Sequence, residues 1–225
     1  DVVRSRGLGD VYKRQGPGAT NAITGIATAF MDSIPMIVIS GQVQSHLIGS
    51  DAFQETDMIG VSRPIVKHSF TVDKQENIAR IVKEAFHIAT SGRQGPVVID
   101  VPKDLTNPDD LFDFNYPSKA NIRSYNPPTK PENHQVARAV DAILAAERPV
   151  IYAGGGTIAS NASDELRELN ELIDFPVTNT LMGLGVYPGT GKRFLGMLGM
   201  HGTYQANMAM HNADLIIAVG ARFDD

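Results

Sequence analysis

The sequence contains no cysteine and no tryptophan among its 225 residues. Without cysteine there can be no disulfide framework and no thiolate zinc site, and the six histidines are too scattered to form a ligand pair at helical spacing. No apolar run approaches the roughly 18 residues that span a bilayer, and the chain does not open on an apolar signal core. We therefore expect a cytoplasmic protein with no membrane partner.

Positive charge is also scarce. The chain has 20 Lys and Arg residues against 25 Asp and Glu residues, a formal net charge of −5. No basic run and no interleaved aromatic stripe is present, which argues against a nucleic-acid partner. A small anionic ligand held by a local site remains compatible with this composition.

Short apolar runs alternate with amphipathic segments along the chain. Continuous apolar runs of this kind predict parallel strands that are covered on both faces. The fold class is therefore α/β, with two incomplete doubly wound parallel-sheet domains. The expected strands are residues 35–40, 67–72, 95–102, 149–153, 175–178 and 214–219, and the expected helices include residues 20–31, 163–173 and 203–212.

Two further helices are predicted from their start signals. Asp73 with Glu76 makes a capping pattern before an apolar stripe that Gly92 ends. Residues 129–132 make a second capping pattern, ahead of the stripe Val136, Val140, Ile143 and Leu144. Residues 103–130 carry several prolines and no sustained period, which indicates an interdomain linker.

Ligands of parallel sheets bind at the carboxyl ends of the strands. Residues 154–159 follow a strand and fit the pattern G-x-G-x-x-A, so they form either a pyrophosphate-binding turn or a plain tight turn. The next strand ends without the acidic residue that would bind a ribose, which disfavours NAD. Residues 189–192 lack the spacing of a phosphate-binding P-loop.

Two other strand ends carry polar groups. Residues 222–225 place one arginine and two aspartates after the last strand, where they could bind phosphate or hydroxyl groups or form a solvated turn. Residues 41–57 place several carboxylates and amides around Phe53, but their spacing assigns no reaction. From the residues alone, the chain is a two-domain, ligand-binding α/β protein.

Several segments together resemble one family. They include GPGATNAITGIATAFMDSIPMIVISGQV, IGSDAFQETDMIGVSRPIVKHSFTV, ATSGRQGPVVIDVPKD and MLGMHGTYQANMAMHNADLIIAVGARFDD. From Gly16 to Asp225 the chain is similar to the bacterial-type catalytic subunit of acetohydroxyacid synthase, also called acetolactate synthase. The resemblance implies thiamine diphosphate, Mg²⁺ and a FAD without net redox chemistry as cofactors.

The implied reaction condenses two pyruvates, or pyruvate and 2-oxobutyrate, with loss of carbon dioxide. Its products are 2-acetolactate and 2-aceto-2-hydroxybutyrate, in the biosynthesis of the branched-chain amino acids isoleucine and valine. The family also implies a homodimer or higher oligomer of catalytic subunits and a regulatory small subunit. By this comparison, residues 16–117 are the C-terminal half of the thiamine diphosphate pyrimidine-binding domain, 118–130 a linker, and 131–225 the N-terminal half of the central FAD-binding domain.

The resemblance also implies site residues. Gln54 in DAFQE lies near thiamine diphosphate, Phe53 faces the substrate, and Lys103 in VPKD lies near the substrate channel. The residues implied to contact FAD are Arg93, Gly155, Thr180, Leu181, Leu198, Gly199, Met200, His201, Gly220, Arg222, Phe223 and Asp224.

The chain departs from the family pattern at both ends. The family's essential glutamate would lie upstream of Gly16, and its motif for Mg²⁺ and diphosphate would lie beyond Asp225. We therefore expect an internal fragment without metal ligands and without activity of its own. Residues 5–15, SRGLGDVYKRQ, resemble a translated sequencing adapter, so residues 1–15 are expected to be an artefact.

Two alternatives stay open. Glyoxylate carboligase, pyruvate oxidase and related thiamine diphosphate enzymes share the three-domain plan. A non-catalytic nucleotide-binding module would need only the glycine turn and the charged end of the last strand.

Overall fold

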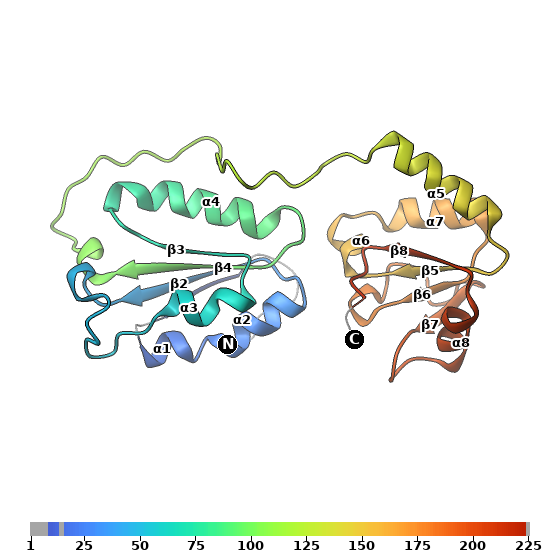
Figure 1. Cartoon of the computed structure of the whole chain (residues 1–225), viewed down its shortest axis with the longest axis horizontal. Coiled ribbons are helices and arrows are strands. Elements are labelled where there is room, and N and C mark those ends of the chain that lie inside the picture. Colours follow the sequence, from blue (N-terminus) through green and yellow to red (C-terminus); the bar gives the residue numbers. More distant parts are fainter. Residues whose placement is uncertain (1–8, 14–15, 224–225) are drawn as a thin grey trace. The chain divides into compact units, whose positions relative to one another are not determined.

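The computed structural model describes residues 9–13 and 16–223, and for residues 9–13 only the backbone. The chain divides into two compact units, one ending at Pro128 and the other beginning at Thr129 (Figure 1). Each unit is built around its own four-stranded sheet.

The first unit contains a parallel sheet in the order β1-β2-β4-β3. Its strands are β1 (Gly9–Lys13), β2 (Met36–Gln42), β3 (His68–Thr71) and β4 (Pro96–Pro102). Its helices are α1 (Pro17–Thr20), α2 (Ile23–Met31), α3 (Met58–Ser62) and α4 (Ile78–Thr90), and 3₁₀ turns occupy Ser45–Leu47, Arg63–Ile65, Gln75–Asn77 and Lys103–Thr106. Helix α4 covers one face of the sheet and α1 to α3 lie on the other (Figure 1).

Alternate residues of the central strands fill two cores. Val38 and Val98 pack with the buried face of α2, whereas Ile37, Val97 and Ile99 pack with α4. Because both faces of β2 and β4 are buried, these strands are apolar without alternation. The predicted coverage of both faces is therefore confirmed for this unit.

The second unit contains a parallel sheet in the order β7-β6-β5-β8. Its strands are β5 (Pro149–Ala153), β6 (Val177–Asn179), β7 (Phe194–Met197) and β8 (Leu215–Val219). Its helices are α5 (Asn133–Ala145), α6 (Gly155–Ala159), α7 (Ser163–Ile173) and α8 (Tyr204–Asn212), and a 3₁₀ turn occupies Leu181–Gly183. The core contains Ile151, Ala153, Leu166, Val177 and Val186.

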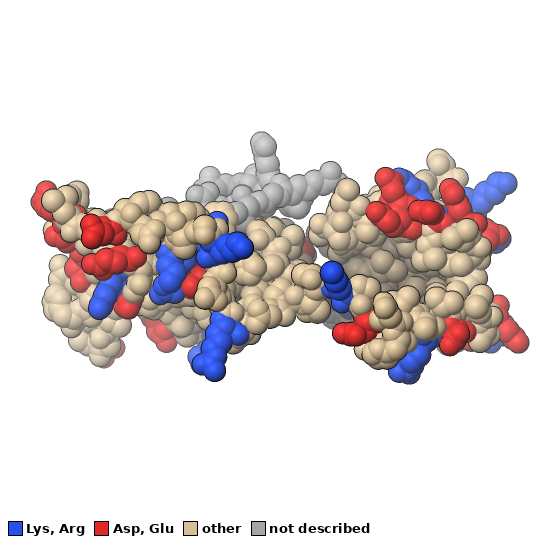
Figure 2. Space-filling view, turned by 90° about the horizontal axis from the view of Figure 1, so that it is seen from above, with Lys and Arg blue, Asp and Glu red and all other residues tan. Residues whose placement is uncertain are grey.

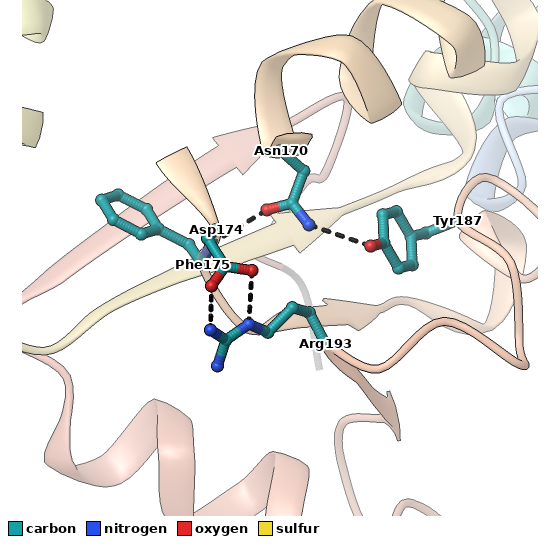
Figure 3. A network of polar contacts seen from close by, with 5 residues as sticks. All are labelled: Asn170, Asp174, Phe175, Tyr187 and Arg193. Carbon is teal, nitrogen blue, oxygen red and sulfur yellow. Dashed lines mark hydrogen bonds and ion pairs between the residues drawn. The ribbon is translucent and has the colours of Figure 1, made fainter. Parts of the chain in front are cut away.

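A polar network joins the end of α7 to β6 at the amino end of that strand (Figure 3). Asn170, 3% exposed, accepts a hydrogen bond from the Phe175 N–H and donates to the Tyr187 hydroxyl at 3.0 Å. Asp174 ends α7 in a left-handed conformation and forms a two-point ion pair with Arg193. Hydrogen bonding to Arg193 lowers the pKa of Asp174. This network fixes the α7–β6 connection away from the strand ends at which ligands bind.

Both predicted capping patterns are wrong. The 3₁₀ turn at residues 75–77 comes first and α4 begins at Ile78, because the Asp73 carboxylate accepts a hydrogen bond from the Asn77 side chain at 2.7 Å instead of capping the helix. Helix α5 begins at Asn133 without a side-chain cap. The apolar stripe of α5 is also not buried, since Val136 and Val140 are each 46% exposed.

Other differences are smaller. The helix predicted over residues 20–31 corresponds to α2, which begins at Ile23 and follows the separate short helix α1, and β6 begins at Val177 rather than Phe175. Strand β7 was missed because Gly196, with φ of 91°, lies in it and the pairing with β6 is irregular. The segment with the resemblance to a sequencing adapter includes β1, which pairs with β2 through backbone groups that are the same for any side chain. Its origin stays a prediction, and residues 1–8 and 14–15 lie outside the described residues.

Charges of both signs are interspersed on the face drawn in Figure 2, within each unit. No helix among the residues that the structure describes is long and apolar enough to cross a bilayer.

Candidate functional site

The loops at the carboxyl edge of the first sheet are tied together by side chains. Gln42, the last residue of β2, donates hydrogen bonds to Asp100 Oδ2 at 2.9 Å and to the Thr56 carbonyl at 2.8 Å. Asp104, just after β4, accepts hydrogen bonds from the backbone N–H and the hydroxyl of Ser45. The segments 41–57 and 103–106, separate in sequence, therefore meet at one edge, as parallel strands require.

Gln54 occupies a strained position at this edge. Its φ is 65°, a left-handed conformation that costs a residue with a Cβ free energy and that concentrates at functional sites. Gly16, with φ of 62°, packs directly against it, since a Cβ on Gly16 would lie 2.7 Å from the Gln54 carbonyl oxygen. The glycine turn and the predicted cofactor-contacting glutamine are thus in direct contact. Phe53, beside Gln54, is 88% exposed.

The other acidic groups of this loop shape it. Glu55 accepts hydrogen bonds from the N–H groups of Gly49 and Ala52, and these bonds lower the pKa of its carboxyl group. Asp57 caps α3 by accepting a hydrogen bond from the Gly60 N–H at 2.8 Å. Both carboxylates therefore hold the backbone around Gln54 by accepting hydrogen bonds from N–H groups of the same loop and of α3.

Asp100 is a buried carboxyl group that the sequence analysis did not single out. It is 2% exposed, and its Oδ1 has no hydrogen-bond partner within residues 9–13 and 16–223. Burial raises the pKa of Asp100 to about 6; Gln42 and Ser40 act in the opposite direction, and the Asp57 carboxylate adds to the increase. The available signal was a carboxylate inside the apolar run of residues 96–102.

The two other predicted residues of the first unit lie at opposite edges of its sheet. Lys103 is exposed and begins the 3₁₀ turn after β4, so it stands at the same edge as Gln54. Arg93 lies before β4, at the opposite edge, where it donates hydrogen bonds to the Ser33 hydroxyl at 3.0 Å and the Phe30 carbonyl at 3.1 Å. The structure therefore does not bring Arg93 and Gln54 together within this unit.

The glycine turn of the second unit is packed against neighbouring backbone. Gly154 donates its N–H to the Val219 carbonyl at 2.8 Å, and Gly156 donates to the Gly220 carbonyl at 3.0 Å. A Cβ on Gly156 would lie 2.8 Å from the Gly220 Cα, and one on Gly155 would lie 3.0 Å from the Met182 Cβ. These glycines permit a close approach of protein to protein, and the two N–H groups are not left for a pyrophosphate.

The segments after β6 and β8 contact this turn, and the segment after β7 joins the end of β6. Thr180 donates its N–H to the Ala153 carbonyl at 2.9 Å, and Leu198 donates its own to the Asn179 carbonyl at 3.2 Å. Asn179, fully buried at the end of β6, has no partner for its Oδ1 among the described atoms. Thr180, Leu181, Leu198 and Gly220 therefore lie at the carboxyl edge of the second sheet.

Large apolar side chains are exposed on these segments. Leu181 is 68% exposed and Phe223, whose ring lies 5.5 Å from that of Tyr152, is 67% exposed. Met200 is 91% exposed on the loop after β7, where Asn207 hydrogen-bonds both backbone groups of Gly199. His201 is exposed on the same loop, Arg222 is partly exposed, and Asp224 lies outside the described residues. Exposed apolar groups at a ligand edge indicate a binding surface.

No group of three or more acidic or histidine side chains that could hold a metal ion occurs in the described part of the chain. The described residues therefore contain two candidate edges, one around Gln54 and one around the Gly154 turn, and no cluster of metal-binding side chains at either.

Comparison with protein families identifies both units. Residues 3–61 match the family described as thiamine pyrophosphate enzyme, N-terminal TPP binding domain, and residues 136–225 match thiamine pyrophosphate enzyme, central domain. Together the two matches cover more than half of the chain, which belongs to the thiamine pyrophosphate enzymes.

The chain is, more narrowly, a homologue of acetolactate synthase large subunits. It is 62% identical over 223 residues to the large subunit of Buchnera aphidicola subsp. Acyrthosiphon pisum, with 99% of this chain and 39% of that protein covered. It is 56% identical over 218 residues to the isozyme 3 large subunit of Escherichia coli K12, with 97% of this chain and 38% of that protein covered. The chain thus spans about 39% of the length of its relatives.

Replacing Asp100 tests the burial of its charge. A carboxyl group with a pKa of about 6 when folded and 3.8 when unfolded stabilises the fold below pH 3.8, and this contribution is lost as the pH rises through 6. Relative to the wild type, we expect Asp100→Asn to gain up to about 3 kcal/mol in unfolding free energy between pH 4 and pH 7. Urea unfolding followed by circular dichroism measures this difference, and a difference that does not change with pH would contradict it.

A methyl group on Gly183 tests the close packing around the glycine turn. Its Cβ would collide with the Ala153 carbonyl oxygen, so we expect Gly183→Ala to lower the free energy of unfolding by about 2 kcal/mol. Gly189→Ala is the matched control, since its Cβ would meet only the Phe194 ring at 4.0 Å, and a change within about 0.5 kcal/mol is expected. Thermal unfolding measures both variants; equal losses would show that packing at Gly183 is not special.

Proposed function

We propose that this chain is part of the catalytic subunit of an acetolactate synthase that condenses two pyruvates, or pyruvate and 2-oxobutyrate, with loss of carbon dioxide. The observation that carries the proposal is similarity to acetolactate synthase large subunits over 97% or more of this chain, spanning both units. The pathway would be the biosynthesis of isoleucine and valine.

The edge around Gln54 fits thiamine diphosphate. Gln54 offers an amide that can donate and accept hydrogen bonds, and it is held in a strained conformation between Gly16 and the rest of its loop. When bound, thiamine diphosphate supplies the group that stabilises the carbanion left by decarboxylation. Gln54 would bind and orient the cofactor, Phe53 would shield the substrate from water, and the Lys103 cation would attract the carboxylate of a 2-oxoacid.

The edge around the Gly154 turn fits the apolar parts of a FAD better than its pyrophosphate. Leu181, Met200 and Phe223 present exposed apolar surface there, whereas the N–H groups of Gly154 and Gly156 are used within the protein. We propose that FAD binds over this surface. Contacts of Gly155, Leu198, His201 and Arg222 with FAD, and of Arg93 from the first unit, are part of the same proposal.

A Mg²⁺ site does not fit the part of the chain that the structure describes, since no acidic or histidine cluster is present there. In the whole enzyme we propose that Mg²⁺ ligands come from outside this chain. We also propose cytoplasmic location, association of catalytic subunits into a dimer or higher oligomer, and a regulatory small subunit; relatives named large subunits support the last of these.

A chimeric enzyme tests the reaction. Residues 16–225 of this chain would replace the matching segment of the Escherichia coli isozyme 3 large subunit, to which the chain is 56% identical. We expect the chimera, supplied with thiamine diphosphate, Mg²⁺ and FAD, to form acetolactate from pyruvate with kcat within about tenfold of the parent enzyme, because core substitutions that conserve pattern preserve the fold.

The unmodified parent enzyme and a chimera heated to inactivation are the controls. A folded chimera that binds FAD but oxidises pyruvate, or condenses glyoxylate, would assign the chain to another thiamine diphosphate enzyme. A folded chimera with no turnover of any 2-oxoacid would contradict the proposal.

A further inference from the structure

The Gln42 side chain uses all of its hydrogen-bonding groups at the edge of the first sheet. Its Nε2 donates to Asp100 Oδ2 and to the Thr56 carbonyl, and its Oε1 accepts from the Val43 N–H at 2.8 Å. A rotated amide would face both acceptors with its oxygen, so only one orientation satisfies the group. Gln42 is 5% exposed, and water cannot replace these partners freely.

Asp100 determines that orientation. A carboxylate accepts but does not donate, and hydrogen bonds to an ionised group are stronger than those between neutral groups. Asp100 is 2% exposed and one of its oxygens has no partner among the described residues. The sheet itself does not require a carboxylate at this position. A buried carboxyl group with an unpaired oxygen costs folding free energy, which points to a role other than stability.

The second bond of Gln42 reaches the loop that carries Gln54. Thr56 lies two residues after Gln54, and its carbonyl accepts from both Gln42 and the Met58 N–H, at 2.8 Å each. On its other side, Gln54 is packed against Gly16. The strained Gln54 residue is therefore packed against Gly16, and the backbone two residues after it is held by the Gln42 amide.

We propose that Asp100 and Gln42 are positioning residues: Asp100 orients the Gln42 amide, and Gln42 holds Thr56 so that Gln54 keeps its left-handed conformation at the sheet edge. What Gln54 binds rests on the proposed function, but the hold on its loop does not. The pair would act on the reaction only through Gln54.

Exchanging the amide and carboxylate groups between positions 42 and 100 distinguishes this role from a general effect on the stability of the fold. In the double variant Gln42→Glu with Asp100→Asn, the two side chains can still hydrogen-bond to each other, now with the amide at position 100 as donor, and the net charge is unchanged. The Thr56 carbonyl loses the hydrogen bond from position 42, because a carboxylate cannot donate, and keeps only that from the Met58 N–H. Asp100→Asn alone keeps an acceptor for Gln42 and is the conservative variant.

The readout is hydrogen–deuterium exchange of the 225-residue chain. The reporter amides are Ala52, Glu55 and Met58, whose N–H groups are hydrogen-bonded within the loop. We expect the double variant to increase the exchange rate of these amides about tenfold or more, with the rates in β5 and β6 unchanged. In Asp100→Asn the rates of the same amides should remain within about threefold of the wild type. Asp104→Ala is the matched control, since it removes the neighbouring link to Ser45 and leaves the Thr56 bond in place.

If the reporter amides of the double variant exchanged at the wild-type rate, the proposal would be overturned. A uniform increase over the whole first unit, or its unfolding, would overturn it too, because the pair would then serve the fold as a whole. In the chimeric enzyme the double variant should lower kcat while leaving the KM for pyruvate within about twofold, since Gln54 is proposed to act on the cofactor. An inactive chimera would count against the proposed function without affecting the exchange result.

Discussion

Parallel pairing of strands that are buried on both faces decides where polar groups can lie in this protein. Strands β2 and β4 in the first unit and β5 in the second are largely apolar and buried on both faces, so an unpaired polar side chain within them costs folding free energy. Each connection must also return to the amino edge before the next strand begins. The loops that leave the carboxyl ends therefore gather at one edge of each sheet.

Several of the buried polar groups lie at those edges, whereas others, such as Asn170 in α7, do not. Gln42 and Asp100 lie at or near the ends of β2 and β4, and Asn179 ends β6. Asp100 raises the free energy of the folded state at neutral pH, because its charge is buried against one amide. We interpret this free-energy cost as offset by a role in fixing the loop, because the same carboxylate orients Gln42, which holds the backbone beyond Gln54. In the second unit the corresponding order comes from glycines, where backbone meets backbone without side chains.

Much of the fold follows from sequence pattern. The strand over residues 149–153 and the helix over residues 163–173 were predicted with the bounds that the structure has, because continuous apolar runs and amphipathic stripes specify them. Strand β7 could not be predicted, since it contains a left-handed glycine and only four residues. The capping pattern at Asp73 failed because the Asn77 amide competes for the same carboxylate, a contact that a pattern of residue types does not contain.

The sequence predicted where the candidate site lies, but it did not predict what the individual residues do there. The loop after β2 was expected to carry polar groups at a ligand edge, and Gln54 and Phe53 lie there. Asp100 was not foreseen, because its burial depends on the pairing of β4 with β2 and its hydrogen bond on Gln42, which lies 58 residues before it. The roles of the individual site residues came from the family resemblance and stay predictions.

The central claim is that the edge around Gln54 binds thiamine diphosphate, and calorimetric titration of the chimeric enzyme with the cofactor tests it most directly. The account predicts that Gln54→Ala weakens binding by about tenfold or more, while Gln44→Ala, a neighbouring glutamine before the first 3₁₀ turn, leaves the affinity within about twofold. Equal affinity for thiamine diphosphate in the Gln54→Ala variant and its parent would contradict the account.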